Sequence, residues 1–303
     1  MLSTAIILPG EEETFPFDSL RTISGVEWDG IFYSGKRQHP SFDRSLIFSS
    51  PEIIPLICDL LIVIDPLFCT FDYLSFAIRN GCHLFLSDKL KLTTDERKQL
   101  VLLANEGGTY IQIQNDFLFH PFQKKIRNNS NQTTFIEAFQ TAPEKYDQMD
   151  ELLSNNLLMI LRAAGSMVHK VDVFRCANQL QNPDVLKIHI TFKNGSDAEL
   201  TLKFNESDEV HLLSVDAAGE VTIFDFVRNK ISHLPKNELR KILKGVSSNP
   251  LQLQISEFIE NIAQKNNPGY SLSDEMVVFL LMDTIREKLK TTSQSPSIHQ
   301  HNQ

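Results

Sequence analysis

The stretch Asp59-Leu60-Leu61-Ile62-Val63-Ile64-Asp65 decides the fold of this sequence. A continuous run of branched apolar residues is typical of a strand in a parallel sheet that is covered on both faces. After it we predict a helix at 71–80, a strand at 83–86, a helix from the capping box at 93–96 to Glu106, and a strand at 109–114. Strands and helices that alternate in this way, joined by right-handed crossovers, form a parallel, doubly wound sheet.

Two further strands precede this block, at 4–10 and 26–33. With them, the first part of the chain has the element order of a Rossmann-like domain, for which we predict the bounds 1–121. Glycine is scarce for a nucleotide-binding protein, at 12 of 303 residues, although loops that hold phosphates depend on glycine.

The pattern changes after Pro121. A helix is predicted at 148–164, and strands follow at 167–176, 185–193, 198–204, 210–215 and 221–226. Asn194-Gly195 and Ala218-Gly219 stand between strands and are typical of hairpin turns. Apolar and polar residues alternate from Leu186 to Phe192, which indicates an antiparallel sheet with one covered face.

Helices are then predicted at 236–244, 251–264 and 273–290, followed by a polar, disordered tail at 291–303. The sequence thus predicts an α/β protein with two domains. The first is Rossmann-like with a parallel sheet, and the second, at 122–290, is an α+β domain with an open, mainly antiparallel sheet.

Composition excludes several classes of protein. The formal net charge is −9 and no basic stripe stands out, so neither nucleic acid nor an anionic membrane is an expected partner. The longest apolar run, 56–67, contains two aspartates and is too short to span a bilayer. No two of the 4 cysteines are spaced as CxxC, and no histidines have companions at metal-ligand spacing. We therefore expect buried, reduced thiols, a cytoplasmic location and no metal.

Four motifs follow one another in a characteristic order between the third strand and the end of the first domain. They are Asp59-Leu-Leu-Ile-Val-Ile-Asp-Pro66, Ala77-Ile-Arg-Asn-Gly-Cys-His-Leu-Phe-Leu86, Leu90-Lys-Leu-Thr-Thr-Asp-Glu-Arg97 and Phe119-His-Pro121. Two later stretches, which start at Gln252 and Ser271, have the pattern of the C-terminal helices of the same family. In this order the sequence resembles the Gfo/Idh/MocA family of oxidoreductases.

The resemblance implies an NAD(P)-binding first domain and a second domain that takes sugars, inositols or similar polyols. It also implies a homodimer or tetramer that forms through the second domain's sheet. These family properties are compared below with the residues of this chain.

The loop after the first strand departs from the family's GxGxxG pattern. Only Gly10 remains of the glycines, and Glu11–Glu13 follow it where a pyrophosphate would approach. One carboxylate at ~5 Å from a phosphate charge costs about 3 kcal/mol at an effective dielectric near 20. The glutamates could instead be solvated acids that favour a helix N-terminus. Either interpretation disfavours ordinary dinucleotide binding.

Other cofactor positions also depart from the family. The ribose-binding acid would fall near Ser34, and no carboxylate is there; Ser34 with Lys36 and Arg37 could meet a 2′-phosphate or form a solvated loop. The family's threonine-proline turn is replaced by Asp65-Pro66. Asp65 either brings a negative charge to the cofactor, or it caps the helix region at Phe71 or holds the turn.

The catalytic positions of the family are changed as well. Its lysine position falls on Asp88, with Lys89 one residue late, so that only a local bulge would bring Lys89 to the site. Its histidine position falls on Asn155, which cannot exchange a proton near neutral pH. Loss of a positioned acid or base typically costs about 10²–10⁴ in rate.

Three functions remain as hypotheses. The first is a non-catalytic homologue that binds a ligand or supports a partner, and that has no assured cofactor. The second is an active NAD(P)-dependent oxidoreductase with a rebuilt site, in which Lys89, His83 or His120 carries the proton. The third is a scaffold that assembles through the second domain's sheet.

Overall fold

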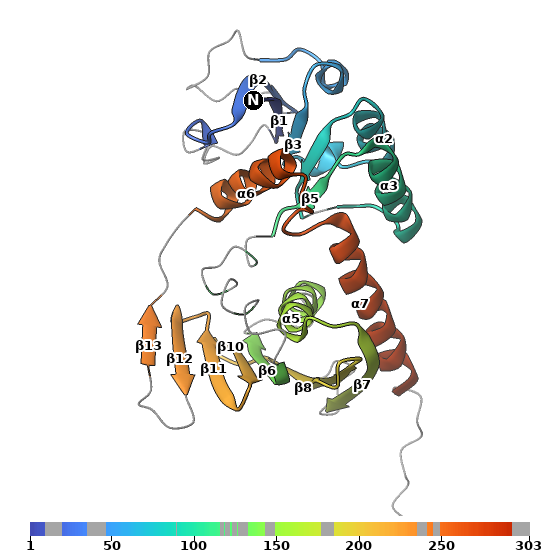
Figure 1. The fold of residues 1–303 in the computed structure, drawn as a ribbon. Helices are drawn as coiled ribbons and strands as arrows, with labels where there is room; N and C mark the ends of the chain where they lie inside the picture. Colours follow the sequence, from blue (N-terminus) through green and yellow to red (C-terminus); the bar gives the residue numbers. More distant parts are fainter. Residues whose placement is uncertain are drawn as a thin grey trace, which may run out of the picture. The chain divides into compact units, whose positions relative to one another are not determined.

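The structure, a computed structural model of the chain, describes residues 1–9, 20–34, 47–88, 90–115, 118, 122, 126, 133–142, 149–176, 185–234, 241–244 and 249–292. The chain divides into two compact units. The first consists of Met1–Phe119 and Ser248–Val277, and the second of His120–Ser247 and Val278–Gln303. Each unit contains its own sheet (Figure 1).

The first unit is built on a five-stranded sheet in the order β2-β1-β3-β4-β5. Its strands are β1 (Leu2–Leu8), β2 (Val26–Tyr33), β3 (Leu60–Val63), β4 (His83–Leu86) and β5 (Ile111–Ile113). All neighbouring pairs are parallel. Every residue of β3 is buried, because helices cover both faces of the sheet. The predicted parallel, doubly wound sheet is confirmed.

Helices α2 (Phe71–Arg79) and α3 (Thr94–Gly107) lie on one side of this sheet, and α6 (Pro250–Gln264) lies on the other (Figure 1). The Thr93 capping box starts α3 as predicted, and Gly108 ends it in the left-handed conformation that favours glycine. Two short 3₁₀ helices, η2 (Pro51–Leu56) and η3 (Pro66–Phe68), flank β3.

The division of the chain differs from the predicted bounds of 1–121 and 122–290, because residues 248–277 join the first unit. Helix α6 buries an apolar stripe that includes Ile255 and Phe258 against Ile6, Leu60 and Phe85 of the parallel sheet. A stripe of this kind shows that a helix has an apolar partner, but not which sheet provides it. The sequence therefore predicted the helix and not the unit to which it belongs.

The second unit is built on an eight-stranded, mainly antiparallel sheet in the order β13-β12-β11-β10-β6-β9-β8-β7. Its strands are β6 (Thr133–Ala142), β7 (Val168–Cys176), β8 (Val185–Phe192), β9 (Asp197–Phe204), β10 (His211–Ala217), β11 (Glu220–Asp225), β12 (Lys230–Leu234) and β13 (Lys241–Lys244). Helix α5 (Met149–Ala164) packs on β6 and β9, and α7 (Leu272–Thr292) is the last helix. The predicted fold class is confirmed in both sheets.

Three strands of this sheet were not predicted. Strand β6 lies between β9 and β10, parallel to the former and antiparallel to the latter. Residues 236–244 were predicted to be helical, but 241–244 form β13, antiparallel to the equally unpredicted β12. Pairing with a neighbouring strand overrides the local helix preference of this charged segment. Residues 235–240 lie outside the described residues.

The cysteines of the described first unit, Cys58, Cys69 and Cys82, are buried and unbridged, as the apolar runs around them predict. Within the described ranges, none of the helices combines the length and apolar character needed to cross a bilayer.

Candidate functional site

The carboxyl edge of the parallel sheet is the candidate site of the first unit. In open α/β sheets, ligands bind at the carboxyl ends of the strands where the strand order reverses. Here that point lies at β1, which has β2 on one side and β3 on the other. The backbone N–H of Ser34 donates to the Leu8 carbonyl (3.2 Å), and that of Asp65 donates to the Ile7 carbonyl (3.3 Å). Ser34 and Asp65 therefore flank the end of β1.

Asp65 is the most unusual residue of this edge, because it is an acid with only 2% of its surface exposed. Its Oδ1 accepts a hydrogen bond from the backbone N–H of Leu67 (2.9 Å), so Asp65 caps η3. Its Oδ2 is buried and has no hydrogen-bond partner among the described residues. A buried acceptor that is left unsatisfied costs about 1–3 kcal/mol. The turn-holding role predicted for Asp65 is confirmed, but it uses only one of the two oxygens.

The turn that carries Asp65 is fixed by aromatic packing. The ring of Phe68 in η3 meets Phe32 of β2 and Tyr73 of α2 edge-on, at centroid distances of 5.5 and 5.7 Å. Pro66 is the first residue of η3, where its locked backbone favours a helix start. The unpaired oxygen of Asp65 is therefore held in place by a packed turn.

Tyr33 is the last residue of β2, beside Ser34. Burial raises the pKa of the Tyr33 phenol to about 12. The phenol thus stays protonated at neutral pH and cannot act as a general base. Ser34 is exposed, and its backbone N–H makes the bond to β1 described above.

The exit of β4 is the next part of the carboxyl edge. The Ser87 N–H donates to the Val63 carbonyl (2.8 Å), which places Ser87 at the end of β3. Asp88 follows it with an exposed side chain that accepts a hydrogen bond from the Ser87 hydroxyl (3.3 Å). The position where the resemblance implies the family's lysine is thus occupied by an exposed acid. Asp88 cannot replace an ammonium group that orients a substrate.

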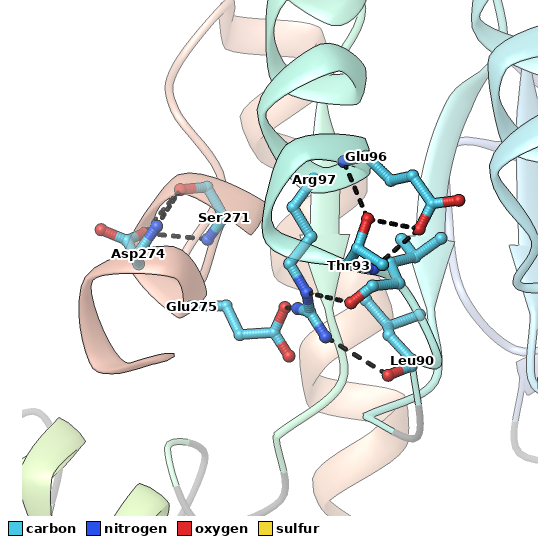
Figure 2. Close-up of polar contacts among 8 residues, drawn as sticks. Leu90, Thr93, Glu96, Arg97, Ser271, Asp274 and Glu275 are labelled. Carbon is cyan, nitrogen blue, oxygen red and sulfur yellow. Dashed lines mark hydrogen bonds and ion pairs between the residues drawn. The ribbon is translucent and has the colours of Figure 1, made fainter. Parts of the chain in front are cut away.

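A buried ion pair joins α3 to the first turn of α7, beside the β4–α3 connection (Figure 2). Arg97 of α3 contacts the carboxylate of Glu275 in the first turn of α7, and their side chains are only 5% and 16% exposed. Burial raises the pKa of Glu275, and the charge of Arg97 opposes this shift, while Asp88 adds to it. Arg97 also donates from Nε to the Leu92 carbonyl (3.1 Å) and from its second terminal nitrogen to the Leu90 carbonyl (3.3 Å).

The sequence does not predict this pair, because Arg97 and Glu275 are 178 residues apart. The capping box at Thr93 predicted the start of α3. No local pattern distinguishes Arg97 from the other charged residues of the helix, so only the tertiary structure identifies its partner.

In the second unit, the position where the resemblance implies the family's histidine is Asn155 of α5, whose side chain is half-buried. Its neighbour Asn156 is fully buried, and its amide nitrogen donates to Oε1 of Gln140 (2.6 Å) and to the Leu152 carbonyl (2.7 Å). Neither asparagine exchanges a proton near neutral pH. Helix α5 therefore offers no acid or base at these two positions.

His83 does not supply a base at the carboxyl edge. His83 is the first residue of β4, at the opposite edge of the sheet, and a four-residue strand is ~10 Å long. Its ring stacks on Tyr110 and its Nδ1 accepts the Tyr110 N–H (3.0 Å). Burial lowers the pKa of His83. The hypothesis that His83 carries a proton in this site is therefore wrong.

Several predicted positions lie outside the described residues: Gly10, Glu11–Glu13, Lys36, Arg37, Lys89 and His120. The structure does bring Ser34, Asp65 and Pro66 to one edge, and places Asp88 along the same edge. Among the residues that the structure describes, no three His, Cys, Asp or Glu side chains gather as metal ligands.

Comparison with solved structures gives full-length matches at low sequence identity. UDP-N-acetylglucosamine 3-dehydrogenase GnnA from Acidithiobacillus ferrooxidans aligns over 97% of this chain and 99% of its own, with a TM-score of 0.77 and 17% identity. The dehydrogenase MviM from Clostridium difficile aligns over 94% of this chain and 99% of its own, with a TM-score of 0.74 and 15% identity. An NAD binding oxidoreductase from Klebsiella pneumoniae aligns over 96% and 97%, with a TM-score of 0.75 and 10% identity.

No protein-family profile matches the sequence, and no curated protein matches it. The fold is nevertheless shared along nearly the whole chain with the proteins named above, which agrees with the resemblance of the motifs. This chain has the two-sheet fold of the Gfo/Idh/MocA-type dehydrogenases and oxidoreductases.

Proposed function

We propose that this chain is a non-catalytic, ligand-binding homologue of the oxidoreductases whose fold it shares. Among the described residues, the buried Oδ2 of Asp65 beside the end of β1 has no partner, and this observation carries the proposal. In open α/β sheets a dinucleotide binds at this edge with an anionic pyrophosphate, which a buried carboxylate repels. This repulsion disfavours NAD and NADP.

Two further features support the loss of redox chemistry. The resemblance puts Asp88 and Asn155 at the positions of the family's lysine and histidine. Asp88 cannot supply the ammonium group that orients a substrate, and Asn155 cannot transfer a proton near neutral pH. Glu11–Glu13 add negative charge to the sequence after the first strand. With these replacements, the residues that would orient a substrate and move its proton are absent from the described part of the site.

A ligand that suits this edge offers a hydrogen-bond donor to Asp65. A hydroxyl group of a sugar-like molecule or polyol meets this requirement, because hydroxyl groups donate and carry no charge. Burial of such a donor against Oδ2 would satisfy the acceptor that is now unpaired.

The test is isothermal titration with NAD⁺, NADP⁺, myo-inositol and D-glucose, on the wild type and two variants. We expect no saturable binding of either dinucleotide, and binding of a polyol that Asp65→Asn weakens at least about tenfold, as the loss of one charged acceptor implies. Asp59→Asn is the matched control, because Asp59 precedes β3 at the opposite edge of the sheet.

Micromolar binding of NAD⁺ or NADP⁺, or turnover of a polyol with either of them, would reject the proposal. That outcome would favour the alternative, an active NAD(P)-dependent oxidoreductase. The alternative is supported by the shared fold with named dehydrogenases along nearly the whole chain.

We further propose a homodimer or tetramer that forms through the face of the second sheet opposite α5. This face carries ion pairs between Lys187 and Glu199 (2.7 Å) and between His189 and Asp197 (3.7 Å), together with exposed Phe174. Light scattering on wild type and Phe174→Glu tests the assembly. A monomeric wild type would exclude it.

A cytoplasmic location is part of the same proposal. Buried, unbridged thiols are typical of proteins in a reducing compartment, and Cys58 and Cys82 remain unbridged although their sulfurs are only 4.0 Å apart.

A further inference from the structure

The β4–α3 connection runs from Ser87 to Thr93 along the carboxyl edge and includes Asp88, at the family's lysine position. A connection of this kind would ordinarily be mobile, because a loop lacks the hydrogen bonds of a helix or strand. In this connection, however, described groups hold the chain at both ends. The Ser87 N–H is bonded to β3, and Thr93 is bonded to Glu96 in the capping box of α3.

Arg97 holds the middle of the connection. Its guanidinium group donates to the carbonyls of Leu90 and Leu92 at 3.3 and 3.1 Å, so one planar side chain fixes two backbone groups of the connection (Figure 2). A guanidinium presents several donors in a rigid plane, which suits simultaneous bonds to separate acceptors. An ammonium group in the same place could not reproduce this arrangement.

Glu275 holds Arg97 in turn. It lies in the first turn of α7, which Ser271 and Asp274 cap by reciprocal bonds: the Asp274 N–H donates to the Ser271 hydroxyl (3.1 Å), and the Ser271 N–H donates to the Asp274 carboxylate (2.9 Å). The strand-like segment before α7 is attached to β5, because the Ile113 N–H donates to the Tyr270 carbonyl (2.9 Å). The position of the Glu275 carboxylate is therefore fixed by the cap of α7 and by the bond between Tyr270 and β5.

We propose that Arg97 and Glu275 are positioning residues of the carboxyl-edge site, which hold the β4–α3 connection so that Asp88 is presented at a fixed place. We call Arg97, Glu275 and the Leu90 and Leu92 carbonyls the Arg97 clamp. The role of this edge as a ligand site rests on the proposed function, but the mechanical role of the clamp can be measured without any ligand.

The test is hydrogen exchange, followed by mass spectrometry, on peptides that cover residues 87–93 of the full chain. Arg97→Lys keeps the charge and can keep the contact with Glu275, but it cannot bridge both carbonyls. We expect exchange in the connection to rise at least about tenfold in Arg97→Lys, which corresponds to the loss of roughly 1.4 kcal/mol of local protection. Glu275→Gln retains an acceptor for Arg97 and should cause a smaller rise in the same peptides.

The matched control is Arg286→Lys. Arg286 also pairs with carboxylates, Asp150 (2.9 Å) and Asp283 (2.6 Å), but it belongs to the second unit. The variant Arg286→Lys should leave hydrogen exchange in the β4–α3 connection unchanged. An unchanged connection in Arg97→Lys would overturn the proposal, and so would a rise spread evenly over β1–β5, because that pattern describes a general loss of stability.

Hydrogen exchange tests the Arg97 clamp, and the titrations test the non-catalytic function, so either proposal can be rejected without the other. If NADP⁺ binds tightly, the non-catalytic function is rejected while the clamp stands or falls on exchange alone. If the connection exchanges freely in the wild type, the clamp is rejected while the ligand preference of Asp65 remains untouched.

Discussion

The two edges of the parallel sheet differ in how their acidic side chains are paired. At the amino edge, the Ser3 N–H donates to Asp59 (3.0 Å), the Ser3 hydroxyl contacts Asp29 and the Ile57 carbonyl (2.8 Å), and His83 accepts from Tyr110. At the carboxyl edge, Asp88 is exposed, and the buried Oδ2 of Asp65 has no partner among the described residues. A buried acid costs more to leave unpaired than a neutral hydroxyl such as that of Thr109 at the amino edge. Asp65 therefore supports the ligand site proposed at the carboxyl edge.

The largest expected effect comes from breaking the buried pair of the Arg97 clamp. Arg97→Met leaves Glu275 with a buried carboxylate and no cation, and should lower the free energy of unfolding by about 3–5 kcal/mol. Replacement of both residues, in Arg97→Met with Glu275→Leu, removes the charge along with its partner. Urea denaturation should then show most of the stability restored. If the double variant is no more stable than the single one, the two residues are not coupled.

A smaller pair of effects compares the two edges directly. Ser3→Ala removes the hydroxyl that bonds at the amino edge and should cost about 1 kcal/mol of unfolding free energy. Asp65→Asn keeps the oxygen that accepts from Leu67 and changes only the unpaired one, so it should leave stability unchanged or slightly higher. Thermal unfolding measures both variants. A loss in Asp65→Asn as large as that in Ser3→Ala would show that the second oxygen of Asp65 has a partner in the fold.

Glu275 and His83 should contribute to the pH dependence of stability with opposite signs. Burial raises the pKa of Glu275 above its ordinary value of 4.5. Its folded form binds the proton more tightly than its unfolded form, so its contribution is full below pH 4.5 and is lost as the pH rises through the folded pKa. Arg97 and Asp88 are the charged groups that face it. Glu275→Gln should therefore lose less stability than the wild type between pH 4 and pH 7.

His83 should show the reverse. Burial lowers its pKa below the ordinary 6.5, against a weaker opposing effect of Asp59. Its contribution is present above pH 6.5 and is lost as the pH falls through the folded pKa, because protonation of Nδ1 also breaks the bond from Tyr110. His83→Asn should reduce the loss of stability in this window. Urea denaturation at a series of pH values measures both variants, and the same slope for both would contradict the comparison.

The sequence predicted most elements of the fold because their signals are local. The branched run at Leu60–Val63 marks a strand covered on both faces, and Thr93 and Gly108 mark the ends of α3. The hairpin turns at Gly195 and Gly219 adopt the positive φ values of 85° and 78° that favour glycine.

The elements that the sequence did not predict depend on partners far away in the chain. Strand β6 has little apolar alternation of its own and forms between β9 and β10, and β13 is a charged segment that pairs with β12. The membership of α6 in the first unit depends on contacts with residues far earlier in the chain, such as Ile6, Leu60 and Phe85.

For the candidate site, the sequence predicted which residues lie at the carboxyl edge, since a strand end can be read from its pattern. Ser34, Asp65 and Pro66 are indeed at that edge. The unpaired oxygen of Asp65 could not be predicted, because burial and pairing depend on the packed turn around it. The same holds for the long-range contact between Arg97 and Glu275.

The claim that this edge rejects a dinucleotide is tested most directly by a titration of NADPH followed through the fluorescence of its nicotinamide ring, on wild type and Asp65→Asn. The account predicts that the wild type does not saturate below about 1 mM, an affinity of roughly 4 kcal/mol, and that Asp65→Asn binds more tightly because a repelling charge is removed. Saturation of the wild type in the micromolar range, with no gain in Asp65→Asn, would contradict it.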